Sequence, residues 1–117
     1  MIPKEIEGYD WEQAFRFCIV PNVSPVIESS ARAGAFSRAD VMRVVAVSEG
    51  VNDEYNWLCV VELNDGRFAF VSAGCDFTGW DCQASGYAMV DTDLQHLIRF
   101  GLGDNDRARL GLVSEAP

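Results

Sequence analysis

The chain has 117 residues, of which 49% are hydrophobic and 11% aromatic, and its 18 Asp and Glu residues against 9 Lys and Arg residues give a formal charge of −9. This length and apolar content suffice for one domain with a hydrophobic core, so we expect a folded chain and not a disordered one. The negative charge repels phosphate groups, so we expect neither direct nucleic-acid binding nor membrane binding.

A helix over about residues 11–19 is the first predicted element. Apolar side chains recur there at helical spacing, at Trp11, Ala14, Phe15 and Cys18. Asp10 precedes them as a candidate N-cap, and Pro21 ends the helix. Two prolines and a glycine within residues 21–36 then predict an irregular connection over the surface.

Runs rich in valine and aromatic residues predict an antiparallel meander in the middle of the chain. Its three strands cover about residues 42–49, 56–63 and 67–73. Asp65 and Gly66 separate the second strand from the third, and this dipeptide predicts a type I′ turn, in which both central residues have positive φ. A fourth strand over about residues 86–90 would make the sheet three- to four-stranded.

Two C-terminal helices complete the predicted fold, over about residues 93–100 and 105–110. Thr92 is a candidate N-cap of the first helix, and Gly111 suits the end of the second. Helices that flank a small antiparallel sheet make the fold class α+β. We expect one domain over residues 1–117, with the N-terminal helix and irregular connection in residues 1–35 and the core in residues 36–112.

The segment GCDFTGWDCQ, residues 74–83, is the part of the chain richest in chemically active side chains. It follows the third strand directly, so it is predicted to be a long hairpin connection, and such loops often carry function. Phe77 and Trp80 either pin this loop to the sheet or point outward as anchors for a partner. Asp76 and Asp81 beside them would steer Arg or Lys residues of that partner, so these four residues are the candidate partner-binding site.

Cys75 and Cys82 form a possible thiol pair in the same segment. Six residues separate them, which matches neither a C-x-x-C redox motif nor the closer cysteine spacing of a zinc site. The one histidine, His96, is predicted to be exposed on a helix and is the sole candidate base for a cysteine nucleophile. We therefore assign no catalytic residue, metal ligand or cofactor.

Three stretches carry a resemblance to other proteins, namely DGRFAFVSAGCDFTGWDCQASG, DLQHLIRFGL and RARLGL. The chain resembles a group of small acidic proteins of bacteria and their phages that share a SAGCD[FY]TGWDCQ core and a C-terminal LIxFGL helix. The resemblance covers about residues 36–112 and brings no known activity with it. It implies a cytoplasmic protein of a bacterial cell or of a phage-infected host.

Taken together, these features predict a non-enzymatic protein-interaction module. We expect an acidic inhibitor or adaptor that acts on a protein partner with a basic, nucleic-acid-binding surface, as phage anti-defence and DNA-mimic proteins do. A homodimer is compatible with the sequence. Two alternatives stay open, a redox-sensing or structural metal site at Cys75 and Cys82, and a purely structural domain.

Overall fold

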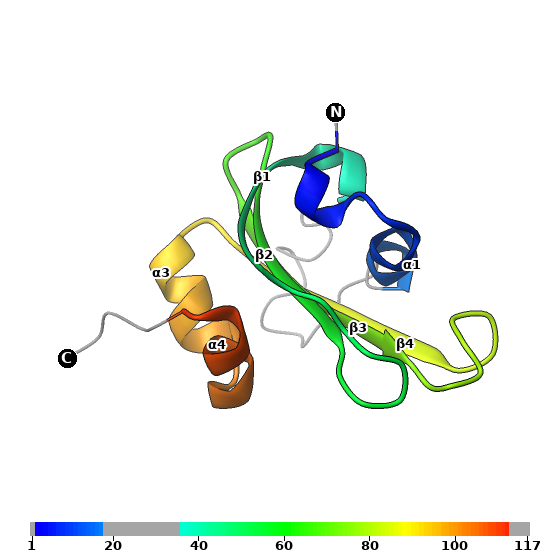
Figure 1. Cartoon of the computed structure of the whole chain (residues 1–117). Helices are drawn as coiled ribbons and strands as arrows, with labels where there is room; N and C mark the ends of the chain where they lie inside the picture. The colour runs from blue at the N-terminus through cyan, green and yellow to red at the C-terminus, as the bar shows by residue number, and fades with distance from the viewer. Residues whose placement is uncertain (1, 18–35, 113–117) are drawn as a thin grey trace, which may run out of the picture.

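A four-stranded antiparallel sheet forms the centre of the computed structural model, which describes residues 2–17 and 36–112 (Figure 1). The strands lie side by side in chain order: β1 (Val41–Ser48), β2 (Trp57–Leu63), β3 (Phe68–Cys75) and β4 (Ala84–Asp91). All three expected strands form, and the fourth strand is present as well. The α+β class is therefore confirmed.

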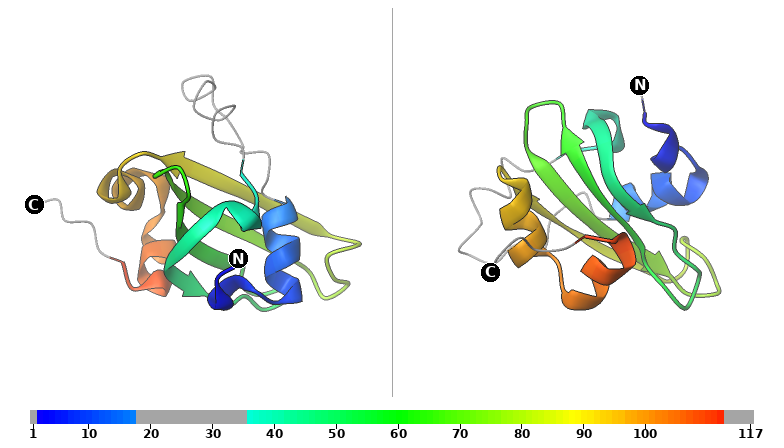
Figure 2. Two further views of the ribbon diagram at one scale, coloured as in Figure 1. Left: turned by 90° about the horizontal axis from the view of Figure 1, so that it is seen from above. Right: turned by 60° about the vertical axis from the view of Figure 1, so that its left-hand side comes forward.

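Helices cover both faces of this sheet, as two views of the ribbon show (Figure 2). The short η1 (Lys4–Ile6) and the helix α1 (Tyr9–Phe17) lie on one face. The C-terminal elements lie on the other: α3 (Leu94–His96), the π-helical turn η4 (Leu97–Gly101) and α4 (Asp104–Leu110). A short 3-10 turn, η3 (Arg38–Asp40), leads into β1.

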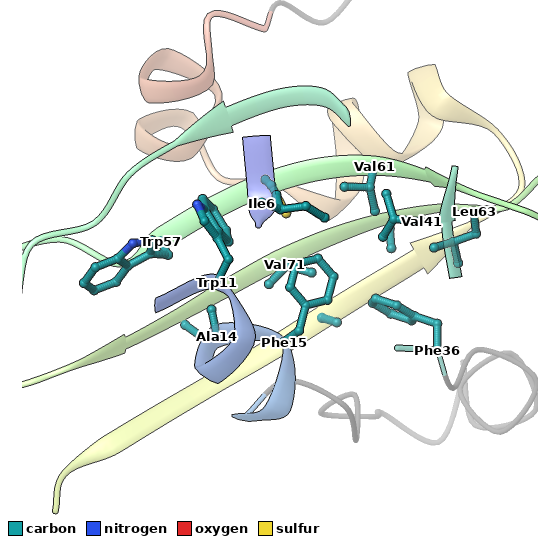
Figure 3. Close-up of a cluster of buried hydrophobic side chains, with 14 of the residues drawn as sticks. Ile6, Trp11, Ala14, Phe15, Phe36, Val41, Trp57, Val61, Leu63 and Val71 are labelled. Carbon is teal, nitrogen blue, oxygen red and sulfur yellow. The ribbon is translucent and has the colours of Figure 1, made fainter. Parts of the chain in front are cut away.

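Alternation along the central strands divides the core between the two faces. Cys59, Val61 and Val71 face α1, whereas Leu58, Val60 and Phe70 face the C-terminal helices. The α1 side is the larger cluster and holds Trp11, Trp57 and Trp80 (Figure 3 shows the first two). Because both faces of β2 and β3 are buried, these strands are apolar at nearly every position.

The β2–β3 hairpin differs from the predicted type I′ turn. Gly66 has a φ of 90°, but Asp65 is not among the described residues with positive φ. Gly66 N–H bonds to the carbonyl of Leu63 at 3.0 Å, and Leu63 N–H bonds to the carbonyl of Arg67 at 2.8 Å. The loop thus has three residues and places only Gly66 in the left-handed region. Asp65 instead accepts hydrogen bonds from the backbone and guanidinium of Arg67.

The N-terminal helix begins earlier than predicted, at Tyr9, so Asp10 lies inside α1 and is not its N-cap. The carbonyl of Gly8 accepts the first helical bond, from Glu12 N–H at 3.1 Å. The carboxylate of Asp10 is thereby free to reach a side chain on another element. The predicted end of the helix, Cys18 and most of the connection at 21–36 lie outside the described residues.

The predicted helix 93–100 divides into α3 and η4, and Asp93 rather than Thr92 caps it. Oδ1 of Asp93 accepts a 2.9 Å hydrogen bond from His96 N–H, which satisfies a free amide of the first turn. The left-handed Gly111, with a φ of 68°, ends α4 as expected. Within the described ranges, none of the helices has both the length and the apolar character that a membrane crossing requires.

Candidate functional site

The loop between β3 and β4 is a tightly bonded turn. Oδ1 of Asp76 accepts a hydrogen bond from Thr78 N–H at 2.8 Å and a second from the Thr78 hydroxyl. The backbone N–H of Asp76 donates to the carbonyl of Gln83 at 3.1 Å, which closes the base of the loop. Gly79 has a φ of 95°, a conformation that other residues rarely adopt. The backbone of the loop is therefore fixed by its own residues.

Trp80 turns inward from this loop. Its side chain is 5% exposed and lies 5.3 Å from the ring of Trp57 and 5.9 Å from the ring of Phe17, measured between ring centroids. Its indole N–H donates a 3.0 Å hydrogen bond to Oδ1 of Asp10 in α1. Of the two arrangements left open for this ring, the structure shows the one that pins the loop. Trp80 is thus part of the core and cannot offer its ring to a partner while the core is intact.

Phe77 turns outward from the same loop and is 79% exposed, the most exposed large apolar side chain among the described residues. Asp81 is exposed next to Trp80, and Asp76 is partly buried where it holds the turn. An exposed phenylalanine on a fixed turn loses little conformational freedom when it binds. Of the predicted site residues, Phe77, Asp76 and Asp81 therefore share a surface, and Trp80 supports that surface from beneath.

The connection between β1 and β2 lies against this loop, at the same end of the sheet (Figure 1). Asp53 N–H donates a 2.8 Å hydrogen bond to the carbonyl of Cys75. Asn56 packs closely on Gly74, because a Cβ added to Gly74 would lie 2.3 Å from Oδ1 of Asn56. Tyr55 is 56% exposed on this connection. The local sequence indicates only a polar loop here, so it does not single out these residues. The predicted meander could have done so, because its first and third connections lie at the same end of the sheet.

A groove of about 360 Å³ separates the two loops. Asp53, Glu54 and Tyr55 line one side of it, and Asp76 and Gln83 line the other. Segments 49–56 and 74–85 together contain five acidic residues and no Lys or Arg. We call this surface the acidic end and define it by six residues: Asp53, Glu54, Tyr55, Asp76, Phe77 and Asp81.

A cation from α4 borders the acidic end. The guanidinium carbon of Arg109 lies 5.3 Å from the centroid of the Tyr55 ring, and its Nη2 donates a 2.9 Å hydrogen bond to the Ser48 hydroxyl. This contact holds Tyr55 against the body of the protein. Phe77 is therefore the ring of the acidic end that projects furthest from it, as its greater exposure indicates.

The two cysteines of the loop are not joined by a disulfide. Burial raises the pKa of the Cys75 thiol, and the nearby carboxylates of Asp10 and Asp76 raise it further. A raised pKa lowers the fraction of thiolate, which is the reactive form. In the described ranges, no group of three or more His, Cys, Asp or Glu side chains is arranged to hold a metal ion.

His96 lies at the opposite end of β4 from these thiols. Cys75 pairs with Ala84 at one end of the β3–β4 ladder, and Asp91 pairs with Phe68 at the other, about 23 Å away at the usual rise of a strand. The imidazole of His96 is exposed, as predicted, and its Nδ1 contacts the carboxylate of Asp91. His96 is therefore too far away to act as a base for either Cys75 or Cys82.

Comparison of the chain with protein-family models, with curated protein sequences and with solved structures finds no match in any of the three. Function must consequently be inferred from the geometry of the acidic end.

Proposed function

We propose that the protein is a non-enzymatic interaction module that binds a basic surface of a protein partner through its acidic end. One observation carries this proposal: two loops from different parts of the chain are hydrogen-bonded together, and between them they present exposed rings among carboxylates while containing no Lys or Arg. A rigid aromatic anchor surrounded by charge is the usual composition of a binding surface.

Phe77 and the carboxylates would contribute in different ways. Removing an exposed phenylalanine from water contributes about 1.5–3 kcal/mol, so Phe77 is the main source of affinity. The carboxylates of Asp53, Glu54 and Asp81 attract Arg and Lys side chains and speed association at low salt. We therefore expect the partner to carry a small apolar pocket that receives Phe77 and basic residues around that pocket.

The chemistry of such a partner is that of a nucleic-acid-binding protein, whose basic groups normally meet phosphates. We propose an inhibitor or adaptor role in a bacterial cytoplasm or in a phage-infected host, with carboxylates in the place of phosphates. The alternative of a thiol or metal site is less well supported, because the pKa of Cys75 is shifted away from the reactive thiolate.

Affinity capture from a bacterial lysate tests the proposal with variants of the acidic end. The first variant is Phe77→Ala, and the second is Asp76→Asn with Asp81→Asn. Asparagine keeps the oxygen that Thr78 donates to, so the turn persists while the charge is lost. We expect a basic protein to be captured by the wild type and at least about tenfold less by either variant, with capture falling as salt is raised.

Two matched controls distinguish binding by the acidic end from nonspecific binding by exposed rings or charges elsewhere. Phe100→Ala removes another exposed ring, 64% exposed on η4, and Glu5→Gln with Glu7→Gln removes two exposed charges near η1. Both controls should capture the partner as well as the wild type does. Equal capture by all variants, or no basic protein captured by the wild type, would contradict the proposal.

A further inference from the structure

The floor of the groove between the two loops is the last residue pair on one face of the sheet. Gly74 and Ser85 face each other across the β3–β4 ladder. They lie on the same face as Phe70 and Tyr87, which belong to the cluster beneath the C-terminal helices. Ser85 is exposed, whereas Phe70 is buried. The C-terminal helices therefore cover this face of the sheet but leave its last pair open.

Asn56 presents a hydrogen-bond acceptor over this floor. Its Nδ2 donates a 3.0 Å hydrogen bond to the Ser72 hydroxyl, which fixes the orientation of the amide. Its Oδ1 occupies the space that a Cβ on Gly74 would need. Among the described residues, none donates a hydrogen bond to this Oδ1. The floor of the groove thus carries a neutral acceptor that the protein itself does not use.

Both walls of the groove carry acceptors as well. Asp53 and Glu54 line one wall, and Asp76 and Gln83 line the other. Oδ1 of Asp76 already accepts from Thr78, so Oδ2 of the same carboxylate remains for another donor. The described residues that line the groove include no Lys or Arg. A donor placed in the groove would therefore meet acceptors on three sides.

The chain itself shows that a guanidinium packs on the ring beside this groove. The guanidinium carbon of Arg109 lies 5.3 Å from the centroid of Tyr55, while Nη2 donates to the Ser48 hydroxyl and to the Glu49 carbonyl. Arg109 is not among the residues that line the groove, whereas Tyr55 is one of them and remains 56% exposed. The Tyr55 ring therefore keeps free surface on which a second guanidinium could stack.

A guanidinium matches these acceptors better than an ammonium group or a metal ion does. It is planar and carries five N–H donors in a fixed fork, so it can bond to the floor and to both walls at once. An ammonium group is a compact point charge with three donors. In the described ranges, no set of three or more His, Cys, Asp or Glu side chains is arranged for a metal. The volume of about 360 Å³ leaves room for a long side chain.

We propose that the groove receives an arginine side chain of the protein partner. The guanidinium of that arginine lies over Gly74, donates to Oδ1 of Asn56 and to the carboxylates of the walls, and stacks on Tyr55. This inference rests on the proposed function, because the groove belongs to the acidic end. Phe77 enters the apolar pocket of the partner, and the arginine of the partner enters the groove.

Titration of the isotope-labelled full chain with short peptides, followed by NMR, tests the inference. The probe is acetyl-Gly-Arg-Gly-amide, and its analogues carry lysine or citrulline, which has the shape of arginine without its charge. The arginine peptide should shift the amides of residues 53–56, 74–76 and 83–85, with a Kd on the order of 1 mM. The lysine peptide should bind at least about threefold more weakly and the citrulline peptide at least about tenfold more weakly.

Two variants of the groove and one matched control accompany the peptides. Asp53→Asn with Glu54→Gln removes the charges of one wall, and asparagine tolerates the φ of 68° that residue 53 adopts. Gln83→Lys places an ammonium group in the opposite wall. Both variants should bind the arginine peptide at least about fivefold more weakly and should capture the partner less well. Glu5→Gln with Glu7→Gln removes two exposed charges elsewhere and should change neither result.

Each other outcome overturns the inference. Equal binding of the arginine and citrulline peptides shows that charge is not recognised, and equal binding of the arginine and lysine peptides shows that the acceptors do not select a guanidinium. Shifts confined to other surfaces, or no binding at about 10 mM peptide, remove the arginine site. Undiminished capture by Gln83→Lys shows that the partner does not use the groove. In all these cases, capture by Phe77→Ala decides the proposed function separately.

Discussion

The indole N–H of Trp80 and the Oδ1 atom of Asp10 form a 3.0 Å hydrogen bond that joins the β3–β4 loop to the first helix of the chain. The bond is partly buried, and it connects residues that are 70 positions apart. Together with the contact between Trp80 and Trp57, it fixes the loop from below. The direction of Phe77 is therefore a consequence of how Trp80 is held.

Trp80→Ala should lower the free energy of unfolding by about 3–5 kcal/mol, because it leaves a large cavity in the core. Trp80→Phe keeps part of the ring volume but loses the bond to Asp10, and should cost about 1–3 kcal/mol. Urea unfolding measures both values. Phe77→Ala is the matched control and should change stability by less than about 0.5 kcal/mol, since that ring is exposed. Similar costs for Phe77→Ala and Trp80→Ala would contradict the structure.

Gly50→Ala tests the close packing of Trp57 on the chain just after β1. A Cβ on Gly50 would lie 2.3 Å from Cε3 of the Trp57 ring and 2.7 Å from its backbone nitrogen, so the strand itself would have to shift. We expect a loss of about 1–3 kcal/mol in unfolding free energy. Gly8→Ala is the control, because a Cβ added there would have no atom within 4 Å and Gly8 is not among the described residues with positive φ. An unchanged midpoint for Gly50→Ala would show that Trp57 packs elsewhere.

The sheet could be predicted from the sequence because each strand and turn is indicated by residues that are adjacent in the chain. Runs rich in valine and aromatic residues mark the strands, and Gly66 marks a turn because it lies between two such runs. The predicted hairpin type was wrong because Asp65-Gly66 fits both a two-residue and a three-residue loop. The hydrogen bond between Leu63 and Arg67 decides between them.

The division of roles between Phe77 and Trp80 could not be predicted in the same way. Both are aromatic, three positions apart and flanked by Asp, so their local sequences are nearly equivalent. Trp80 is buried because Asp10 and Trp57, far away in sequence, supply a hydrogen-bond acceptor and a ring for it. The hydrogen bond from Asp53 N–H to the carbonyl of Cys75 could not be predicted either, because only the folded sheet brings these two residues together.

Thiol labelling should distinguish the cysteines by burial and pKa. Of the three cysteines in the described ranges, Cys82 is exposed and should react first with iodoacetamide at neutral pH. Cys75 should react more slowly, because it is partly buried and its pKa is raised by burial and by the charges of Asp10 and Asp76. Cys59, which is buried, should react only when the chain unfolds. Peptide mass spectrometry over time gives the order, and faster labelling of Cys75 than of Cys82 would contradict it.

Stability should fall at alkaline pH partly through Tyr87. Burial of the ring raises the pKa of its hydroxyl above 10.0, repulsion from Asp106 adds to this, and a hydrogen bond with Ser72 acts in the opposite direction. The folded chain thus holds this proton more tightly than the unfolded chain, so the stabilisation is complete below pH 10.0 and is lost as pH rises through the folded pKa.

Urea unfolding of the wild type and of Tyr87→Phe between about pH 9 and pH 11.5 measures this effect. The wild type should lose more stability over this range than the variant does, because phenylalanine cannot ionise. Parallel curves for the two proteins would show that the Tyr87 hydroxyl has the same proton affinity in both states.

The order of the strands has a consequence for how the chain folds. Every strand pairs with its neighbour in sequence, so the sheet can grow hairpin by hairpin with short loop closures. The side chains of α1 reach the rest of the protein through bonds that span 38 and 70 residues, from Trp11 to Glu49 and from Asp10 to Trp80. We therefore expect α1 to dock after the sheet has formed. Because Trp11 belongs to α1 and packs in one cluster with Trp57 and Trp80, tryptophan fluorescence during refolding should report that step, whereas amide protection of β2 and β3 reports the formation of the sheet.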